Sequence, residues 1–414
     1  MFDLHGKANR CFLFAWMCPL LFIDGQSIAY SQDLSSSAPI LQRVFEHAWD
    51  QSSVAIGLKS QQFESEAALA AANSWVAGSP TVELSHRFDQ SSGAADVGFK
   101  ESEVLLSSPV WWPAQKSARH ALAVFAAEEL NAQTLQFRLE LASQIREVYW
   151  HVAIAQEEVR ELDEHVQHLV DIAADVQRRV QVGDLARSDE LLANQEAQHA
   201  KAQLASSKIE LQKRKTDYQN LVGLPAPTMF LVEALALPTT DHPRLVMIRS
   251  SLSKAQAALD LANQSRSSAP SIGISLREES TRISASNQAL GVHLQIPIGT
   301  DVQSKPLQTE AQTRVSTVQA ELNRVEAAIK NEVETAKYQL EMEQEALSQA
   351  TERAASASEH LELIQKAFQL GEKGLIDLLR AQLIRHEASN SKVIQQLKVN
   401  WAISKLNQTI GVLP

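Results

Sequence analysis

The chain repeats one pattern twice, and this duplication limits its fold more than any other feature. A glycine follows a helix-like stretch at Gly183 and again at Gly371, and the two positions are 188 residues apart (371 minus 183). The same shift places Asp189 on Asp377. It also pairs Leu191 with Leu379, Ala193 with Ala381, Pro109 with Pro297, and residues 221–225 with 409–413. A register kept over so long a stretch indicates two copies of one structural unit.

The two copies set the domain organisation that we predict. Residues 30–225 form the first repeat, residues 226–242 form a linker, and residues 243–414 form the second repeat. Each repeat is expected to contain a helix, two strands, a long helix and a return helix. These elements are predicted at 41–76, 81–89, 97–110, 113–182 and 189–221, and again at 243–263, 271–280, 289–298, 306–370 and 375–410. The expected fold class is therefore α+β with an internal duplication.

Each strand segment alternates apolar and polar residues. Val82 and Leu84 are separated by a glutamate in the first repeat. In the second repeat, Ile272, Ile274 and Leu276 are separated by glycine and serine. An alternation of this kind is typical of a strand with two different faces. Each segment is about ten residues long, which is the length that a tilted strand needs to cross a bilayer.

The long helical segments carry a narrow apolar seam. In the first repeat, apolar residues recur at steps of three and four, at Val166, Leu169, Ala173, Val176 and Val180. The second repeat keeps this spacing, at Ala354, Ala357, Leu361, Ile364 and Phe368. Such a seam is typical of coiled-coil packing. A helix of about 65–70 residues would span roughly 100 Å.

The glycines are predicted to end the long helices. Gly183 and Gly371 can adopt the left-handed conformation that follows a helix without a steric penalty. In the first repeat, Ser188 is expected to cap the return helix, while Asp189 and Glu190 complement the positive end of its dipole. The two glycine segments are therefore the tips of helical hairpins, one in each repeat.

Composition excludes some classes of protein. The net charge of −11 argues against a nucleic-acid-binding protein, which would carry a basic surface. The sequence contains no phosphate-binding glycine loop and no nucleophile elbow, and its two cysteines both lie near the N-terminus. We therefore expect no enzyme activity, no cofactor and no metal site.

The N-terminus has the features of a secretory signal peptide. Lys7 and Arg10 precede a short apolar run, and small residues follow it. We predict cleavage after Ala29, which makes residues 1–29 the signal peptide. Lipidation at Cys18 and retention of the segment as a buried helix are the alternatives. Elsewhere no stretch of 18 apolar residues occurs, so no transmembrane helix is expected.

Four strands of membrane length cannot close a sheet within one copy. An open edge would leave backbone groups unpaired in lipid. Three copies would supply twelve strands, which is within the range of known barrels. The hairpins also have too narrow an apolar seam to be buried within one chain. We therefore predict a homotrimer in which the sheets form a twelve-stranded β-barrel in the membrane and the hairpins form an α-barrel.

The order of these elements resembles that of the TolC-type outer-membrane efflux channels. The resemblance runs from Leu41 to Pro414 and includes both repeats. Three segments are similar to the branch of that family that serves heavy-metal (cobalt–zinc–cadmium type) efflux. They are SPVWWPAQKSAR at 108–119, QIREVYWHV at 144–152 and NQALGVHLQIPIG at 287–299.

This resemblance implies a function as well as a fold. The protein would be the outer-membrane channel of a tripartite efflux system in a Gram-negative bacterium, with a large periplasmic part. It would be a passive exit duct, and its substrates would be heavy-metal cations. Its partners would be a periplasmic adaptor (membrane fusion) protein, an inner-membrane proton-driven pump of the resistance-nodulation-division type, and outer-membrane lipid.

The resemblance also implies roles for residues at the hairpin tips. The tunnel would close at the second tip, where Asp377 takes the first of two acidic positions of the family and Arg380 takes the second. Phe368 and Lys373 stand where some members use tyrosine and arginine in a closing network. Adaptor docking would involve residues of both tips, namely Gly183, Asp184, Asp189, Gly371 and Glu372. Alternatively, Asp189 and Asp377 only stabilise the N-termini of their helices.

Two other groups of residues are candidates because of their own chemistry. Trp111 and Trp112 end a strand, and we expect them to anchor the protein at the membrane interface or else to pack at a strand–helix junction. His165 and His168, with two glutamates nearby, have a spacing that could bind a metal on one helix face. We expect these histidines to be solvated instead.

Two other functions fit the same sequence. A type I secretion duct would have the same architecture but would export a protein. A secreted coiled-coil scaffold without a pore would use the helices alone, and its strands would not lie in a membrane.

Overall fold

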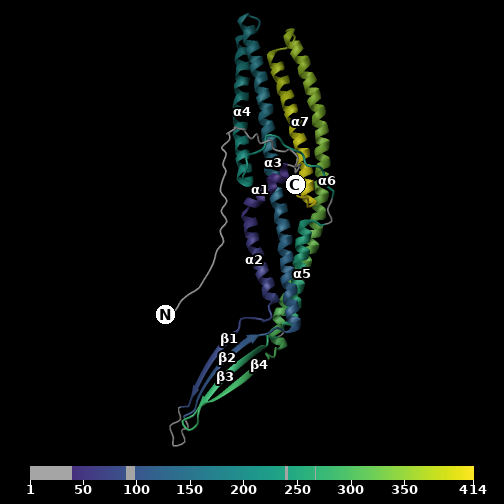
Figure 1. Ribbon diagram of the computed structural model, residues 1–414. Coiled ribbons are helices and arrows are strands. Elements are labelled where there is room, and N and C mark those ends of the chain that lie inside the picture. The colour runs from purple at the N-terminus through teal and green to yellow at the C-terminus, as the bar shows by residue number, and fades with distance from the viewer. Residues whose placement is uncertain (1–39, 90–97, 238–240, 266) are drawn as a thin grey trace, which may run out of the picture. The chain divides into compact units, whose positions relative to one another are not determined.

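The computed structural model describes residues 40–89, 98–237, 241–265 and 267–414 (Figure 1). Its elements are α1 (Ile40–Gln51), α2 (Ser53–Asn73), β1 (Thr81–Phe88), β2 (Lys100–Pro109), α3 (Pro113–Gln181), α4 (Arg187–Val222), α5 (Pro243–Gln264), β3 (Ser271–Ser280), β4 (Asn287–Gln295), α6 (Asp301–Gln369) and α7 (Leu375–Thr409). The predicted signal peptide lies outside the described residues. Within them, no helix is both long enough and apolar enough to cross a membrane. The expected α+β class with a repeated order of elements is confirmed.

The first predicted helix, residues 41–76, is two helices in the structure. Ser52 separates α1 from α2, because it adopts an extended conformation and its Oγ accepts a hydrogen bond from the Val54 N–H at 3.2 Å. Serine competes in this way with the helix for backbone hydrogen bonds. The prediction of one continuous helix was therefore wrong. The equivalent helix of the second repeat, α5, is unbroken and begins at Pro243, a residue suited to the first helical position.

The four strands form one antiparallel sheet in the order β1–β2–β3–β4 (Figure 1). Each repeat contributes a hairpin of two strands, and the pairing of β2 with β3 joins the repeats. In the register, Leu106 of β2 is opposite Val82 of β1 and Ile274 of β3. The predicted strands are confirmed, with ends that differ by a few residues.

The two long helices have the same length. Both α3 and α6 contain 69 residues, so each spans roughly 100 Å. Helix α3 begins at Pro113, as predicted. Helix α6 begins at Asp301, five residues before the predicted Pro306 (306 minus 301), so this proline lies inside the helix. Pro306 lies beyond the first turn and cannot donate to the carbonyl of Val302, so α6 lacks one backbone hydrogen bond there.

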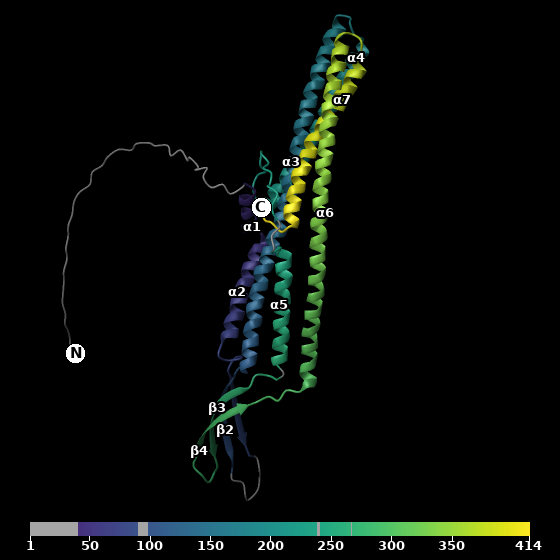
Figure 2. The same ribbon diagram turned by 90° about the vertical axis from the view of Figure 1, so that its right-hand side faces the viewer.

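Helix α3 lies in the middle of the helical layer. It packs against α1, α2, α4, α5 and α7, whereas α6 packs against α5 and α7. Figure 2 shows the α3–α4 and α6–α7 hairpins side by side. The helices next to the sheet therefore follow the order α2–α3–α5–α6, and those toward the tips follow the order α4–α3–α7–α6. In both parts the layer has a first-repeat helix at one edge and α6 at the other.

Buried side chains form a core where α1, α4 and α7 meet the middle of α3. Phe45, Ile145, Tyr149, Trp150 and Tyr218 belong to it, and each is at most 1% exposed. Burying a large apolar side chain stabilises a fold by about 1.5–3 kcal/mol. The Trp150 indole N–H also donates a hydrogen bond to Ser404 Oγ at 3.0 Å. Since Ser404 is on α7, the core holds the two repeats together.

Arg146 fixes the linker against this core. Its guanidinium donates two hydrogen bonds to the Glu233 carboxylate, at 2.8 and 2.7 Å, and a third to Gln408 Oε1 at 2.5 Å. Glu233 lies in the predicted linker, and it also accepts a hydrogen bond from Asn407 at 3.2 Å. The segment QIREVYWHV (144–152) thus supplies contacts both to the core and to the predicted linker.

Candidate functional site: the hairpin tips and the sheet

Both hairpin tips use the same backbone turn. The φ angles of Gly183 and Gly371 are +82° and +76°, in the left-handed region. At the first tip, the N–H of Asp184 donates to the carbonyl of Arg179 (2.8 Å) and that of Gly183 to Val180 (3.0 Å). At the second tip, the N–H of Glu372 donates to the carbonyl of Ala367 (2.8 Å) and that of Gly371 to Phe368 (3.2 Å). This pair of bonds defines a Schellman motif, which satisfies carbonyl groups at the end of a helix. The two glycines therefore end their helices, as predicted.

Asp189, and not Ser188, completes the N-terminus of α4. The helix begins at Arg187, and Asp189 Oδ2 accepts a hydrogen bond from the Ala186 N–H at 3.3 Å. The prediction that Ser188 caps the helix was wrong, because Ser188 already lies in the first turn. Asp377 occupies the equivalent turn of α7, and it is exposed. Both aspartates lie where a negative charge stabilises the positive end of a helix.

Arg179 connects the two tips within one copy. Its guanidinium carbon lies 4.8 Å from the centroid of the Phe368 ring, and its Nη1 donates to the Phe368 carbonyl at 3.4 Å. The same side chain donates from Nε to Asp184 Oδ2 at 2.6 Å. Phe368 is buried among apolar residues of both hairpins. Lys373 and Arg380 are exposed at the same end.

The sheet presents one apolar face. Two rows of apolar side chains cross the four strands in register, Val82–Leu106–Ile274–Val292 and Leu84–Val104–Leu276–Leu290. These side chains are between 45% and 79% exposed. An exposed apolar surface of this extent marks contact with a membrane or with another protein.

The opposite face of the sheet carries paired charges. Glu101 lies between Arg87 and Arg277, with nitrogen–oxygen distances of 3.4 and 2.9 Å. Next to this group, His293 Nε2 lies 3.3 Å from Glu103 Oε1. The strands therefore separate an apolar face from a charged face, which is the pattern of a membrane barrel with lipid outside and water inside.

The edges of the sheet and of the helical layer belong to the same repeats. The sheet ends at β1 on one side and at β4 on the other. Strand β1 and the edge helices α2 and α4 come from the first repeat, whereas β4 and α6 come from the second. The sheet, the helices next to it and the helices toward the tips therefore each have one edge from the first repeat and one edge from the second.

The two tryptophans have different environments. Trp111 donates a hydrogen bond from its indole nitrogen to the Ser74 carbonyl at 3.0 Å, just after the end of α2. Trp112 is 37% exposed. Trp111 is thus packed at a junction of strand and helix, which is the alternative that the sequence left open. A role of either residue at a membrane interface stays a prediction.

The prediction that the histidines of α3 are solvated was wrong for His165. His165 is buried and its ring stacks on that of His386 in α7, whereas His168 is exposed. In the described part of the chain, no group of three or more histidine, cysteine, aspartate or glutamate side chains is arranged to hold a metal ion.

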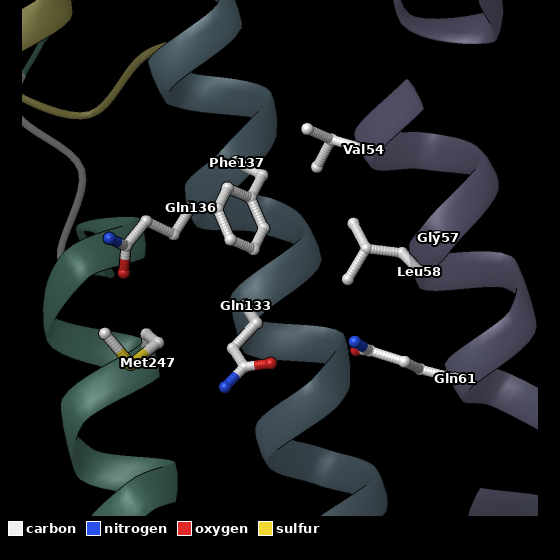
Figure 3. Close-up of a pocket in the computed structure, with 8 residues that line it drawn as sticks. All are labelled: Val54, Gly57, Leu58, Gln61, Gln133, Gln136, Phe137 and Met247. Atoms are coloured by element: carbon white, nitrogen blue, oxygen red, sulfur yellow. The ribbon is translucent and has the colours of Figure 1, made fainter. Parts of the chain in front are cut away.

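Figure 3 shows a pocket of about 390 Å³ between α2, α3 and α5. Leu58 and Gln61 line it from α2, Gln133 and Phe137 from α3, and Met247 from α5. Every lining residue is apolar, glycine or an amide. This pocket therefore offers no acid, base or nucleophile, and it is a packing junction beside the edge helix α2.

Neither a family model nor a curated protein matches the sequence. Solved structures do match. The outer membrane protein VceC from Vibrio cholerae is 14% identical, with 90% of this chain and 96% of that chain covered and a TM-score of 0.72. CusC, whose structures are described in terms of transmembrane channel formation, is 13% identical, with 90% and 92% covered and a TM-score of 0.73.

The open state of the MtrE outer membrane channel of Neisseria gonorrhoeae is also similar. It is 17% identical, with 90% of this chain and 89% of that chain covered and a TM-score of 0.66. At these identities the comparison defines the fold. The chain therefore has the fold of outer-membrane channel proteins, with long helical hairpins and four strands in each copy.

Proposed function

We propose that this protein is the outer-membrane exit duct of a tripartite efflux system in a Gram-negative bacterium. The main support is that the sheet and both parts of the helical layer end at the same two edges. Because the two edges differ, copies would associate head to tail, and such contacts form a ring when the rotation closes. Each copy has four antiparallel strands. The alternation of strand direction would therefore continue from β4 of one copy to β1 of the next.

Three copies would place twelve strands in one barrel. The apolar rows of the sheet would face lipid, and the charged face with Glu101 and Glu103 would face the aqueous lumen. The hairpins would continue the wall as a tunnel in the periplasm. The similarity to VceC, CusC and MtrE supports this location.

The finer part of the proposal concerns substrate and partners. The segments at 108–119, 144–152 and 287–299 support heavy-metal cations as substrates. The exposed tips, with Gly183 and Gly371 at their turns, would dock a periplasmic adaptor protein that connects the duct to a proton-driven pump of the inner membrane. The duct would be passive and would carry out no reaction of its own.

Purification in detergent, followed by recording in planar bilayers, tests the duct. We expect a trimer that needs detergent and that conducts ions. A monomer that is soluble without detergent and gives no conductance would favour a coiled-coil scaffold. Deletion of the gene then tests the substrate. Increased sensitivity to zinc, cobalt or cadmium is expected for metal efflux, whereas loss of one secreted protein at unchanged metal tolerance would favour type I secretion.

A further inference from the structure

A buried polar layer interrupts the contact between the two hairpins of one copy. On α7, Gln382 and His386 are buried, and they are four residues apart on one face of the helix. Opposite them on α3, Glu161 and His165 are each 5% exposed. The seam toward the tips is apolar, with Leu378 among its buried residues. Polar residues in such a seam lower stability and therefore call for another explanation.

The two histidine rings form a parallel stack. The ring centroids of His165 and His386 are 4.0 Å apart, and the angle between the ring planes is 11°. The lone pair of an imidazole nitrogen lies in the plane of its ring. In two parallel rings these lone pairs do not converge on one point, so the stack does not form a site for a single metal ion.

The layer also leaves buried polar atoms without hydrogen bonds. His165 Nδ1, Gln382 Nε2 and Asn390 Oδ1 have no partner among the described residues. Each such atom costs about 1–3 kcal/mol relative to a satisfied one. A hydrogen bond joins α7 to α3 at this level, from Ser389 Oγ to Glu161 Oε2 at 3.1 Å, and the unpaired atoms oppose the contact that it supports.

The charges around the stack are unequal. His386 faces the carboxylates of Glu161 and Glu387 and the guanidinium of Arg385. His165 faces His386, His168 and Arg385, and each of these groups disfavours a proton on its ring. On α6, Arg353 is 3.9 Å from Glu387. Helix α4 presents apolar side chains to this part of α3, namely Ala197, Ala200 and Leu204.

These surroundings favour uncharged rings. Burial, together with the neighbouring His386, His168 and Arg385, lowers the pKa of His165 to about 4. Burial also lowers the pKa of His386. A solvated histidine has a pKa of about 6.5, so the separated helices bind more protons than the packed helices between about pH 6.5 and 4. The contact is therefore complete above this window and is weakened as the pH falls through it.

We propose that the stack of His165 on His386 is a pH-sensitive contact between the two hairpins of each copy. At neutral pH the uncharged rings hold α3 against α7, and acid separates the two helices at this level. The proposal concerns a contact within one copy, so it stands or falls independently of the proposed transport function.

Distance measurement between spin labels tests the contact. Labels at Gln167→Cys on α3 and Leu383→Cys on α7 flank the layer at exposed positions, in full-length protein whose Cys11 and Cys18 are replaced by serine. We expect one short distance near neutral pH. At about pH 5, within the window set by the histidine pKa values, we expect a second and longer distance that disappears on return to neutral pH. An unchanged distance at acid pH would overturn the proposal.

Two substitutions separate titration from a merely structural role. His165→Gln and His386→Gln remove the proton site, and we expect the acid-induced longer distance to be lost. His168→Gln is the matched control, because this histidine is exposed on the same helix, and the acid response should persist. If the first two variants lower the melting temperature but keep the acid response, the layer is structural and the proposal is wrong.

A measurement on the unsubstituted side chains covers the case in which these variants do not fold. Histidine NMR titration should show His165 titrating below about 6.5, with the same midpoint as the change in distance. An ordinary pKa for His165 would contradict the proposal.

Discussion

The two long helices, α3 and α6, have the same length and end in the same turn, yet they lie in different environments. Helix α3 packs against five other helices, and its midpoint carries the fully buried Tyr149 and Trp150. Helix α6 packs against two, and its exposed apolar residues include Val302 (83%) and Tyr338 (63%). Duplication has therefore produced one central helix and one edge helix. In the proposed ring, another copy would cover this edge helix.

Equivalent substitutions in the two repeats should differ most in their effect on stability at Arg146 and at its counterpart, Glu334 (146 plus 188). Arg146 is buried against Glu233, whereas Glu334 is exposed and pairs with Lys337. Removing one partner of a buried ion pair costs about 3–5 kcal/mol. We expect Arg146→Ala to lower the free energy of unfolding by this amount, measured by denaturant titration. Glu334→Ala should give no measurable change, and equal effects would show that the two helices are equivalent.

Next in size is the effect of a charge on the apolar face of the sheet. Leu84 and Ser85 are neighbours on the edge strand β1 and point to opposite faces. An arginine facing lipid costs about 2–4 kcal/mol at the middle of a bilayer. Leu84→Arg should therefore reduce the amount of protein in the outer-membrane fraction. Ser85→Arg, which places its charge opposite Glu103, is the control and should insert normally. Insertion of both variants would argue against lipid at this face.

Alanine substitutions of the two glycines that end the return helices should differ less in the stability that they cost. Gly223 and Gly411 both have positive φ angles, so alanine strains both by about 1–2 kcal/mol. At Gly411 a Cβ would also lie 2.8 Å from Pro243 Cδ, whereas at Gly223 the nearest atom, in His47, is 3.5 Å away. The extra overlap should cost a further ~1–3 kcal/mol. Thermal unfolding of Gly223→Ala and Gly411→Ala measures the difference, and identical melting temperatures would refute it.

The smallest effect is expected at the contact between the tips. Arg179→Ala removes the guanidinium from the Phe368 ring, a cation–π contact worth about 0.5–2 kcal/mol. If the tips close the tunnel, this variant should raise the resting conductance in planar bilayers. Arg178→Ala is the matched control, since Arg178 is exposed and pairs with Asp175 on the same helix. An unchanged conductance in Arg179→Ala would show that this contact does not help to close the tunnel.

Local patterns made much of the fold predictable. The alternation in Ile272, Ile274 and Leu276 identified β3, and the offset of 188 located both hairpin tips. These features depend on neighbours in the sequence, and a periodic pattern records them directly. The helix break at Ser52 was missed, although the amphipathic pattern of α1 does not continue into α2. Ser188 was likewise chosen as a cap by residue type, whereas the backbone starts α4 at Arg187, two residues before the predicted start at Asp189.

Contacts between the repeats could not be predicted. His165 looked solvated because Glu161, Glu164 and His168 lie near it in the sequence, but its partner His386 is 221 residues away (386 minus 165). Arg179 was overlooked for the same reason, because Phe368 is 189 residues away. A polar residue on a seam can be recognised in the sequence, but its burial depends on which helix packs against it.

Threefold closure through the two unlike edges is the central claim, and cysteine cross-linking between β1 and β4 tests it most directly. Within one copy these strands are separated by three strand spacings, or about 14 Å, whereas a disulfide requires Cα atoms within about 7 Å. We would combine Leu84→Cys on β1 with Leu290→Cys, Val292→Cys or Leu294→Cys on β4, in protein lacking Cys11 and Cys18. The account predicts covalent trimers for at least one pair on non-reducing gels, and none for either single substitution. Monomers throughout the set, despite normal folding, would contradict it.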